Sequence, residues 1–119
     1  MIYARIRGGL GNQLFQYSTA RSLADYLNVE LGLDIREFNK NSPYKMSLNK
    51  FNLRADFNPP NLIKHKKYGM KAYLLDHIRG NQRKVYKEPF LMFDKNLLSV
   101  ADGTYLKGYW QTEKYFIKN

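Results

Sequence analysis

Residues 2–34 read IYARIRGGLGNQLFQYSTARSLADYLNVELGLD, and they carry the clearest structural pattern of the sequence. The pattern is a β-prone alternating run, a glycine-rich turn, apolar residues at helical spacing and a second β-prone run. The predicted elements are a strand over residues 2–7, a helix with Asn12 as its N-cap from Gln13 to near Asn28, and a strand over 29–33 that ends at Asp34. This order indicates a βαβ unit with two parallel strands, and therefore the α/β fold class.

The remaining 85 residues show weaker patterns, and Pro43 and the Pro59-Pro60 pair exclude long elements where they lie. The expected elements are a short strand or a cover for the core within 46–53, a helix from Asn61 to about Arg79, extended segments at 85–86 and 90–93, a short helix over 94–100, a strand over 104–109, and a helix capped by Thr112.

Composition restricts the class of protein. The chain has 119 residues, which suits one small domain, and it has no cysteine, which excludes disulfides and thiolate metal sites. No stretch reaches the roughly 18 to 20 apolar residues of a membrane span, and no signal peptide follows Met1. We expect a cytoplasmic protein, at most peripheral on the inner face of the cytoplasmic membrane. The formal charge of +10 favours anionic partners without selecting one.

The glycine-rich turn is the first candidate site. A strand that leads through Gly8, Gly9 and Gly11 into a helix directs free backbone N–H groups at one point, where the helix dipole favours an anion. The side-chain amides of Asn12 and Gln13 add groups that bind sugar hydroxyls or phosphate oxygens. The alternative is an ordinary tight turn between a strand and a helix.

Two nucleotide-binding patterns are incomplete in this turn. The dinucleotide fingerprint needs a third glycine at position 14, where the chain has Leu14, although Gly9, Gly11 and Asp34 fit. The phosphate-binding loop pattern lacks its Gly-Lys-Ser/Thr segment. The sequence therefore argues against an NAD(P) site.

A second candidate segment is Gly108 to Glu113, at the expected carboxyl end of a strand. Ligands of open parallel sheets bind along this edge, so the segment and the glycine-rich turn point to the same rim. Trp110 and Tyr109 would stack on a sugar while Gln111 and Glu113 bind its hydroxyls. The alternative is that Trp110 fills the core.

Basic residues are concentrated between the two candidate segments. They are Lys64, His65, Lys66, Lys67, Lys71, Arg79, Arg83, Lys84 and Lys87. They suggest either a solvated helix face or a small basic α/β module that binds nucleic acid or an acidic membrane surface. No signature of a nucleic-acid-binding module accompanies them, and the spacing of His65 and His77 predicts no metal site.

Two segments resemble a known family. Residues 6–17, IRGGLGNQLFQY, resemble the opening of the bacterial alpha-1,2-fucosyltransferases, glycosyltransferase family 11. Residues 105–116, YLKGYWQTEKYF, resemble that family's LxGYWQSEKYF segment, with Thr112 in place of serine. The block at 86–90, YKEPF, is also similar, so the resemblance extends over essentially the whole chain.

The resemblance implies a GT-B-type glycosyltransferase built from two Rossmann-like halves. Residues 1–119 would form the amino-terminal, acceptor-side half, and the donor-binding half would be absent from a truncated chain. The family transfers L-fucose from GDP-fucose to the 2-hydroxyl of a terminal galactose in a glycan, with inversion and without a required metal or other cofactor. Its donor-binding His-x-Arg-Arg-Gly-Asp segment does not occur in these residues, so we expect the chain alone to be inactive.

The residues expected to bind substrate come from the two matching segments, and no catalytic residue is identified. They are Gly8, Gly9, Leu10, Gly11, Asn12, Gln13, Trp110 and Gln111. The expected partners are a sugar nucleotide, a galactose-terminated glycan and the missing half, with a possible peripheral membrane contact through the basic residues and no nucleic acid.

Overall fold

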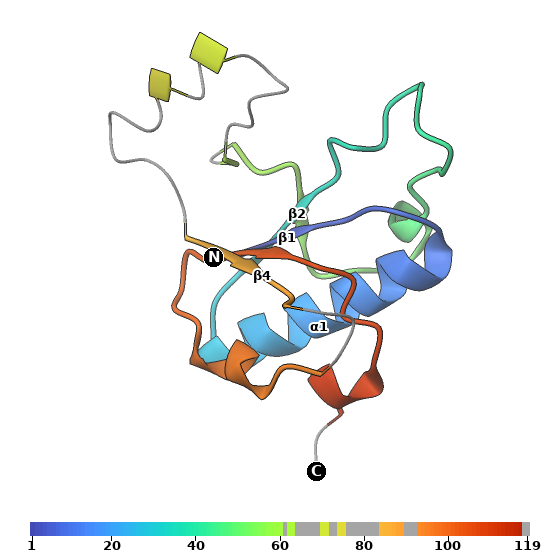
Figure 1. The fold of residues 1–119 in the computed structure, drawn as a ribbon. Helices are drawn as coiled ribbons and strands as arrows, with labels where there is room; N and C mark the ends of the chain where they lie inside the picture. The colour runs from blue at the N-terminus through green and yellow to red at the C-terminus, as the bar shows by residue number, and fades with distance from the viewer. Residues whose placement is uncertain (61, 64–69, 72–73, 76–83, 90–92, 118–119) are drawn as a thin grey trace.

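The computed structural model describes residues 1–60, 62–63, 70–71, 74–75, 84–89 and 93–117. Within these residues the chain forms one five-stranded sheet in which every neighbouring pair of strands is parallel (Figure 1). The strands are β1 (Ile2–Arg5), β2 (Leu31–Asp34), β3 (Asp56–Phe57), β4 (Val85–Lys87) and β5 (Tyr105–Lys107). The predicted α/β class is confirmed, and the sheet is compatible with a Rossmann-like half.

The predicted βαβ unit is present. Helix α1 (Leu10–Leu27) connects β1 to β2, and the parallel register pairs Ile2 with Leu31 and Arg5 with Asp34. The helix ends as predicted at Asn28, whose left-handed φ of 56° lets its N–H reach the carbonyls of the last turn.

The start of α1 differs from the prediction. The N-cap is Gly9 and makes no side-chain cap, so the assignment of Asn12 as N-cap was wrong. Asn12 lies inside the first turn, where its side chain contacts a segment from the other end of the chain. The first strand also ends at Arg5, two residues earlier than predicted, because the chain turns through Gly8 at a φ of +83°.

The strand order is β3-β2-β1-β5-β4. The chain therefore extends from β1 to both sides of the sheet, and the point of reversal lies between β1 and β5. Open α/β sheets bind ligands in the crevice outside the carboxyl ends of the strands at such a point. Here β5, rather than β4, lies next to β1, so the order differs from the 3-2-1-4-5 arrangement of doubly wound sheets.

The elements after β2 differ from the predicted bounds, although the extended segment predicted at 85–86 is present as β4. Three 3-10 helices are present in the described residues: η1 (Leu48–Lys50), η3 (Lys95–Ser99) and η4 (Glu113–Tyr115). Asp94 and Thr112 cap η3 and η4, and the Thr112 cap was predicted. The strand predicted over 104–109 ends at Lys107, because Trp110 has a left-handed φ of 55°. The predicted helix from Asn61 to Arg79 and the basic run at 64–67 lie mostly outside the described residues.

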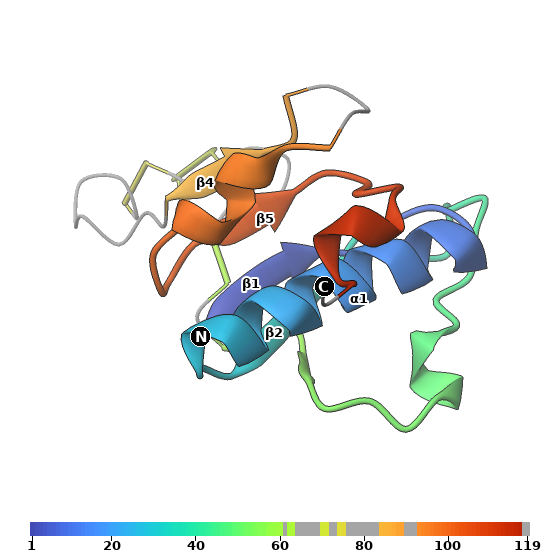
Figure 2. The same cartoon turned by 90° about the horizontal axis from the view of Figure 1, so that it is seen from below.

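Apolar side chains cover both faces of the sheet. On one face, α1 packs along the strands (Figure 2), and the core between them contains Ile2, Ala4, Ile6, Leu33 and Leu106. On the opposite face Tyr3 and Tyr105 pack with Leu62. Side chains in β1 and β5 thus alternate between the faces. None of the described helices is long and apolar enough to cross a membrane.

Candidate functional site

The two segments singled out from the sequence meet at the carboxyl edge of the sheet. Gln111, four residues beyond β5, donates a hydrogen bond from its Nε2 to Oδ1 of Asn12 at 2.5 Å. The two side chains are 99 positions apart in the sequence. The expected common rim is therefore present, and its centre lies at the reversal point between β1 and β5.

A pocket of about 400 Å³ opens near this contact, but neither Asn12 nor Gln111 is among its lining residues. It lies between the glycine-rich turn, the loop that follows β2 and the segment that follows β5. Its lining residues are Arg7, Gly8, Glu37, Phe38, Asn39, Asn41, Ser42, Pro43, Tyr44 and Tyr109. The lining thus combines aromatic rings with amide and hydroxyl groups, a composition suited to a polyhydroxylated ligand.

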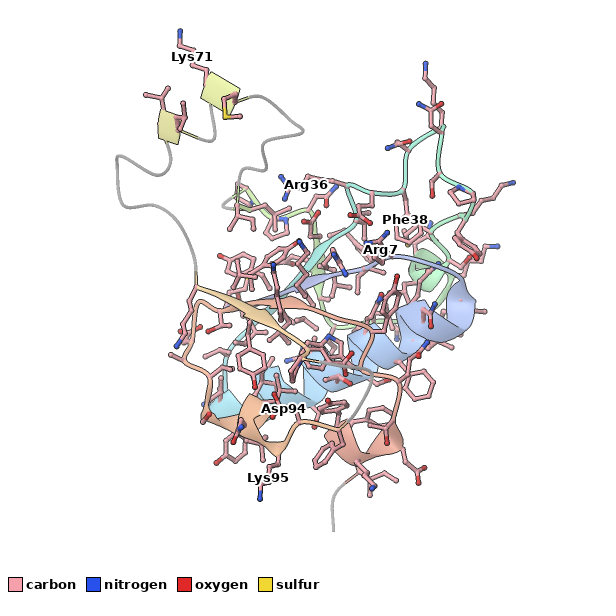
Figure 3. The ribbon with its side chains drawn as sticks, in the orientation of Figure 1. Arg7, Arg36, Phe38, Lys71, Asp94 and Lys95 are labelled. Carbon is pink, nitrogen blue, oxygen red and sulfur yellow. The ribbon has the colours of Figure 1, made fainter. Side chains whose placement is uncertain are left out.

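One ion pair lies at the wall of the pocket. Nε of Arg7 is 3.2 Å from Oε2 of Glu37, and both side chains are partly exposed. The backbone N–H of Arg7 also donates to Oε1 of buried Gln16, which fixes the chain just before the glycine turn. Figure 3 shows Arg7 and Phe38 near each other, on the opposite side of the molecule from Lys95.

Gly8 is placed where a side chain would interfere, whereas Gly9 is not. Gly8 has a φ of +83°, and a Cβ there would lie 2.8 Å from Nδ2 of Asn12. A Cβ on Gly9 would only touch the ring of Tyr44, at 3.6 Å. Gly8 therefore brings the backbone close to Asn12, whereas Gly9 begins α1 beside the pocket.

The other predicted residues of the turn divide into exposed and buried ones. Leu10 is 44% exposed, and Gly11 has open space where its Cβ would be. Gln13 is fully buried, donates to the carbonyls of Gly8 and Lys45 at 2.9 Å each, and accepts from Ser47 N–H at 2.9 Å. Gln13 therefore holds the turn against the loop after β2 and offers no free group to a ligand.

Trp110 is buried, with 1% of its surface exposed. Its ring stacks on Tyr86 at 6.4 Å between centroids and meets the edge of Tyr115 at 5.3 Å. A ring enclosed in this way offers no face to a sugar, so the expected stacking role does not fit Trp110. Phe38, Tyr44 and Tyr109, which line the pocket, are the aromatic side chains available to a ligand there.

Glu88 holds the turn after β5 in place, a role that the sequence did not predict for it. Its Oε1 accepts the backbone N–H groups of Tyr109 and Trp110 at 3.2 and 3.1 Å, and its Oε2 accepts the hydroxyl of Tyr115 at 3.1 Å. A Cβ on Gly108 would lie 2.7 Å from Cβ of Glu88. The YKEPF block thus fixes the turn after β5.

Asp34 forms a buried polar network at the end of β2. It accepts two hydrogen bonds from the guanidinium of Arg36 at 2.9 Å and one from the hydroxyl of Tyr105 at 2.5 Å. Burial alone would raise the pKa of Asp34, but these bonds outweigh it and lower the pKa below its ordinary value. The burial of Tyr105 and the nearby charge of Asp34 raise the pKa of the Tyr105 hydroxyl.

The pocket lining offers groups that can hydrogen-bond to a ligand or pack against it. In the described part of the chain, no three His, Cys, Asp or Glu side chains gather as a metal site would require. Comparisons with known proteins found no matching family model, no similar curated protein and no similar solved structure. Fold and site together therefore define a parallel α/β sheet with a polar, tyrosine-lined pocket at its carboxyl edge.

Proposed function

We propose that this chain forms the acceptor-side half of an alpha-1,2-fucosyltransferase. The observation that carries the proposal is the contact between Asn12 and Gln111. Each belongs to one of the two segments that resemble the fucosyltransferase family. Gly8 and Tyr109, one from each segment, line the same pocket, so both segments would contribute to one binding site.

The pocket suits a neutral sugar. Tyr44 and Tyr109 supply flat apolar surfaces, which pack against the C–H groups of a sugar ring. Asn39, Asn41 and Ser42 supply donors and acceptors for its hydroxyls. A terminal galactose is therefore the ligand that we assign to this pocket.

In this proposal the half-enzyme binds and positions rather than completes the transfer. Charge stabilisation of the departing GDP is expected to be a large part of catalysis. The arginine-containing segment that the family uses for it does not occur in these 119 residues. We therefore expect the isolated chain to bind a galactoside without turning over GDP-fucose, and we expect this to happen in the cytoplasm.

The proposal is tested by titrating the ¹⁵N-labelled chain with lactose, GDP-fucose and duplex DNA while recording amide chemical shifts. Lactose should shift the resonances of residues 8–12, 39–44 and 109–111. Asn12→Ala should weaken lactose binding by about tenfold, because the contact with Gln111 that holds the two segments together next to the pocket is lost. Asn96→Ala, an exposed substitution on η3, is the matched control and should bind like the wild type.

Two results would contradict the proposal. The first is release of GDP from GDP-fucose by the chain alone, measured in a coupled assay. It would show that these residues stabilise the departing GDP without a second half. Salt-sensitive binding of DNA without any response to lactose would favour the second candidate, a basic binding module. The charge of +10 is the observation that keeps this second candidate in the test.

A further inference from the structure

Arg5 is an arginine without a hydrogen-bonding partner for its Nε. It lies in the central strand β1, its side chain is buried with 9% of the residue surface exposed, and its Nε has no acceptor. A guanidinium stays charged at all physiological pH values, so burial without an acceptor is costly. Such a group in a folded protein calls for an explanation.

The register of the sheet places two lysines beside Arg5. β1 and β5 pair Tyr3 with Tyr105 and Ala4 with Leu106, so the next residue of β5, Lys107, follows beside Arg5. Lys107 is in turn paired with Lys87 of β4. Residues opposite each other in neighbouring strands share one face of the sheet. Arg5, Lys107 and Lys87 therefore form a row of three cations, which we call the cation row.

The cation row lies on the face opposite α1. Ile2, Ala4 and Ile6 pack in the core with α1, while Tyr3 packs on the other face with Tyr105. By alternation, Arg5 and Lys107 lie on the face of Tyr3 and Tyr105. The row does not itself line the lactose pocket proposed above, but it lies close enough to the pocket residues Arg7 and Glu37 to feel their charges.

Acidic neighbours of the cation row are engaged by other cations. Asp34 is paired with Arg5 in the register, but its carboxylate binds Arg36 and Tyr105. Glu37 forms its ion pair with Arg7. Burial and the charge of Arg7 lower the pKa of Arg5, and burial with the charges of Arg5 and Lys87 lowers the pKa of Lys107, although the charge of Glu37 acts on both groups in the opposite direction. Positive charge therefore exceeds negative charge along the row.

The position of the row matches where parallel sheets bind anions. Arg5, Lys107 and Lys87 are the last residues of β1, β5 and β4, at the carboxyl edge and beside the reversal point of the sheet. Neighbouring strands lie about 4.8 Å apart, so the row spans about 10 Å. That length accommodates two linked phosphate groups, and arginine binds phosphate oxygens through two parallel hydrogen bonds.

We propose that the cation row binds a phosphate-bearing ligand of the diphosphate class, with Arg5 as its central contact. The bound oxyanion gives Nε of Arg5 the acceptor that it lacks, and it offsets the repulsion among three cations in adjacent strands. The proposal does not depend on the fucosyltransferase assignment, because it rests on the sheet register and on Arg5.

Calorimetric titration and thermal unfolding with inorganic pyrophosphate test the site at constant ionic strength. Pyrophosphate should bind the wild-type chain and raise its Tm, and sodium chloride at matched ionic strength should not. Arg5→Met should lower the affinity by about tenfold or more, because charge-assisted hydrogen bonds are lost. Without pyrophosphate, Arg5→Met should have a Tm at least as high as the wild type, since an unpartnered buried cation is removed.

Two further variants keep the test decisive. Lys107→Gln changes a less buried member of the row and should also weaken pyrophosphate binding if Arg5→Met fails to fold. Lys95→Gln removes the same charge from η3, outside the cation row, and should bind like the wild type. Equal pyrophosphate affinity in Arg5→Met, Lys107→Gln and the wild type would overturn the proposal, as would a Tm shift that sodium chloride reproduces.

A parallel titration with GDP distinguishes the source of the diphosphate. Tighter binding of GDP than of pyrophosphate would assign the site to a nucleotide diphosphate, and equal binding would assign it to the phosphate groups alone. Either result supports the oxyanion site. Failure of lactose to bind, with pyrophosphate binding intact, would refute the fucosyltransferase proposal and leave the oxyanion site standing.

Discussion

The Oε1 atom of Glu88 accepts the backbone N–H of Trp110 at 3.1 Å. This bond holds a non-glycine residue at a φ of 55°, a left-handed conformation that costs about 1–2 kcal/mol. The other carboxylate oxygen binds the hydroxyl of Tyr115, so one side chain joins the end of β4 to both the turn after β5 and η4. The direction in which Gln111 leaves this turn is thus set by Glu88.

Replacing Glu88 should destabilise the whole chain. Glu88→Ala leaves two backbone N–H groups and one hydroxyl without their acceptor, and we expect a loss of about 2–4 kcal/mol. Urea unfolding followed by the fluorescence of Trp110, the one tryptophan, measures it. Glu113→Ala removes an exposed carboxylate nearby and is the control. Equal unfolding midpoints for the two variants would refute the role of Glu88.

Glycines 108 and 11 should respond in opposite directions to an added methyl group. A Cβ on Gly108 would lie 2.7 Å from Cβ of Glu88 and 2.9 Å from the Trp110 ring, so Gly108→Ala should lose about 1–3 kcal/mol. Gly11 lies within α1 with open space around it, and Gly11→Ala should gain about 0.5–1 kcal/mol. Thermal unfolding of both variants checks this contrast. A stabilised Gly108→Ala would show that the packing around Trp110 is loose.

The Asp34 network should make stability depend on acidic pH. Because the folded pKa of Asp34 is lowered, its contribution is fully present above the ordinary value of 3.8 and is lost as pH falls through the folded pKa. Asp34→Asn should therefore be destabilised at neutral pH and lose stability less steeply below pH 4 than the wild type. Unfolding free energies measured from pH 2 to 7 test this, and parallel curves for the two proteins would contradict it.

Tyrosine ionisation should destabilise the chain at alkaline pH. Burial and the neighbouring carboxylates raise the pKa values of Tyr86 and Tyr115 from 10.0 to about 12. Groups with raised pKa values contribute stability that is full below pH 10 and is lost as pH rises toward 12. Tyr115→Phe should flatten this decline while costing about 1–2 kcal/mol at neutral pH through its lost hydrogen bonds. Circular dichroism of urea unfolding between pH 8 and 12 gives the comparison.

The local part of the fold is predictable from the sequence, and the long-range part is not. Residues 2–34 repeat their apolar residues with the periods of strand and helix, and this pattern depends only on near neighbours. The N-cap was wrong because the amide of Asn12 is used by Gln111, 99 positions away. The burial of Trp110 was also unpredictable from near neighbours, because it depends on contacts with Glu88 and Tyr86. The same holds for the position of Lys107 beside Arg5, which follows from the pairing of β1 with β5.

The candidate site was predictable as an edge of the sheet but not as a set of side chains. Carboxyl ends of parallel strands share one rim, so the meeting of the two motifs follows from the α/β pattern. Which members of a motif face a ligand depends on tertiary packing. The side-chain amide of Gln13 is fully hydrogen-bonded to the backbone of Gly8, Lys45 and Ser47. Tyr44, by contrast, lines the pocket from a loop without regular structure.

The position of β1 in the sheet also sets the order in which the chain can fold. One neighbour, β2, follows within about 30 residues, but the other, β5, pairs Tyr105 with Tyr3 across about 100 residues. During synthesis, the β5 side of β1 is therefore an open edge until residues 105–107 have left the ribosome. Over that interval the nascent protein exposes a strand edge that invites pairing with other chains, and rapid closure by β5 is what protects it.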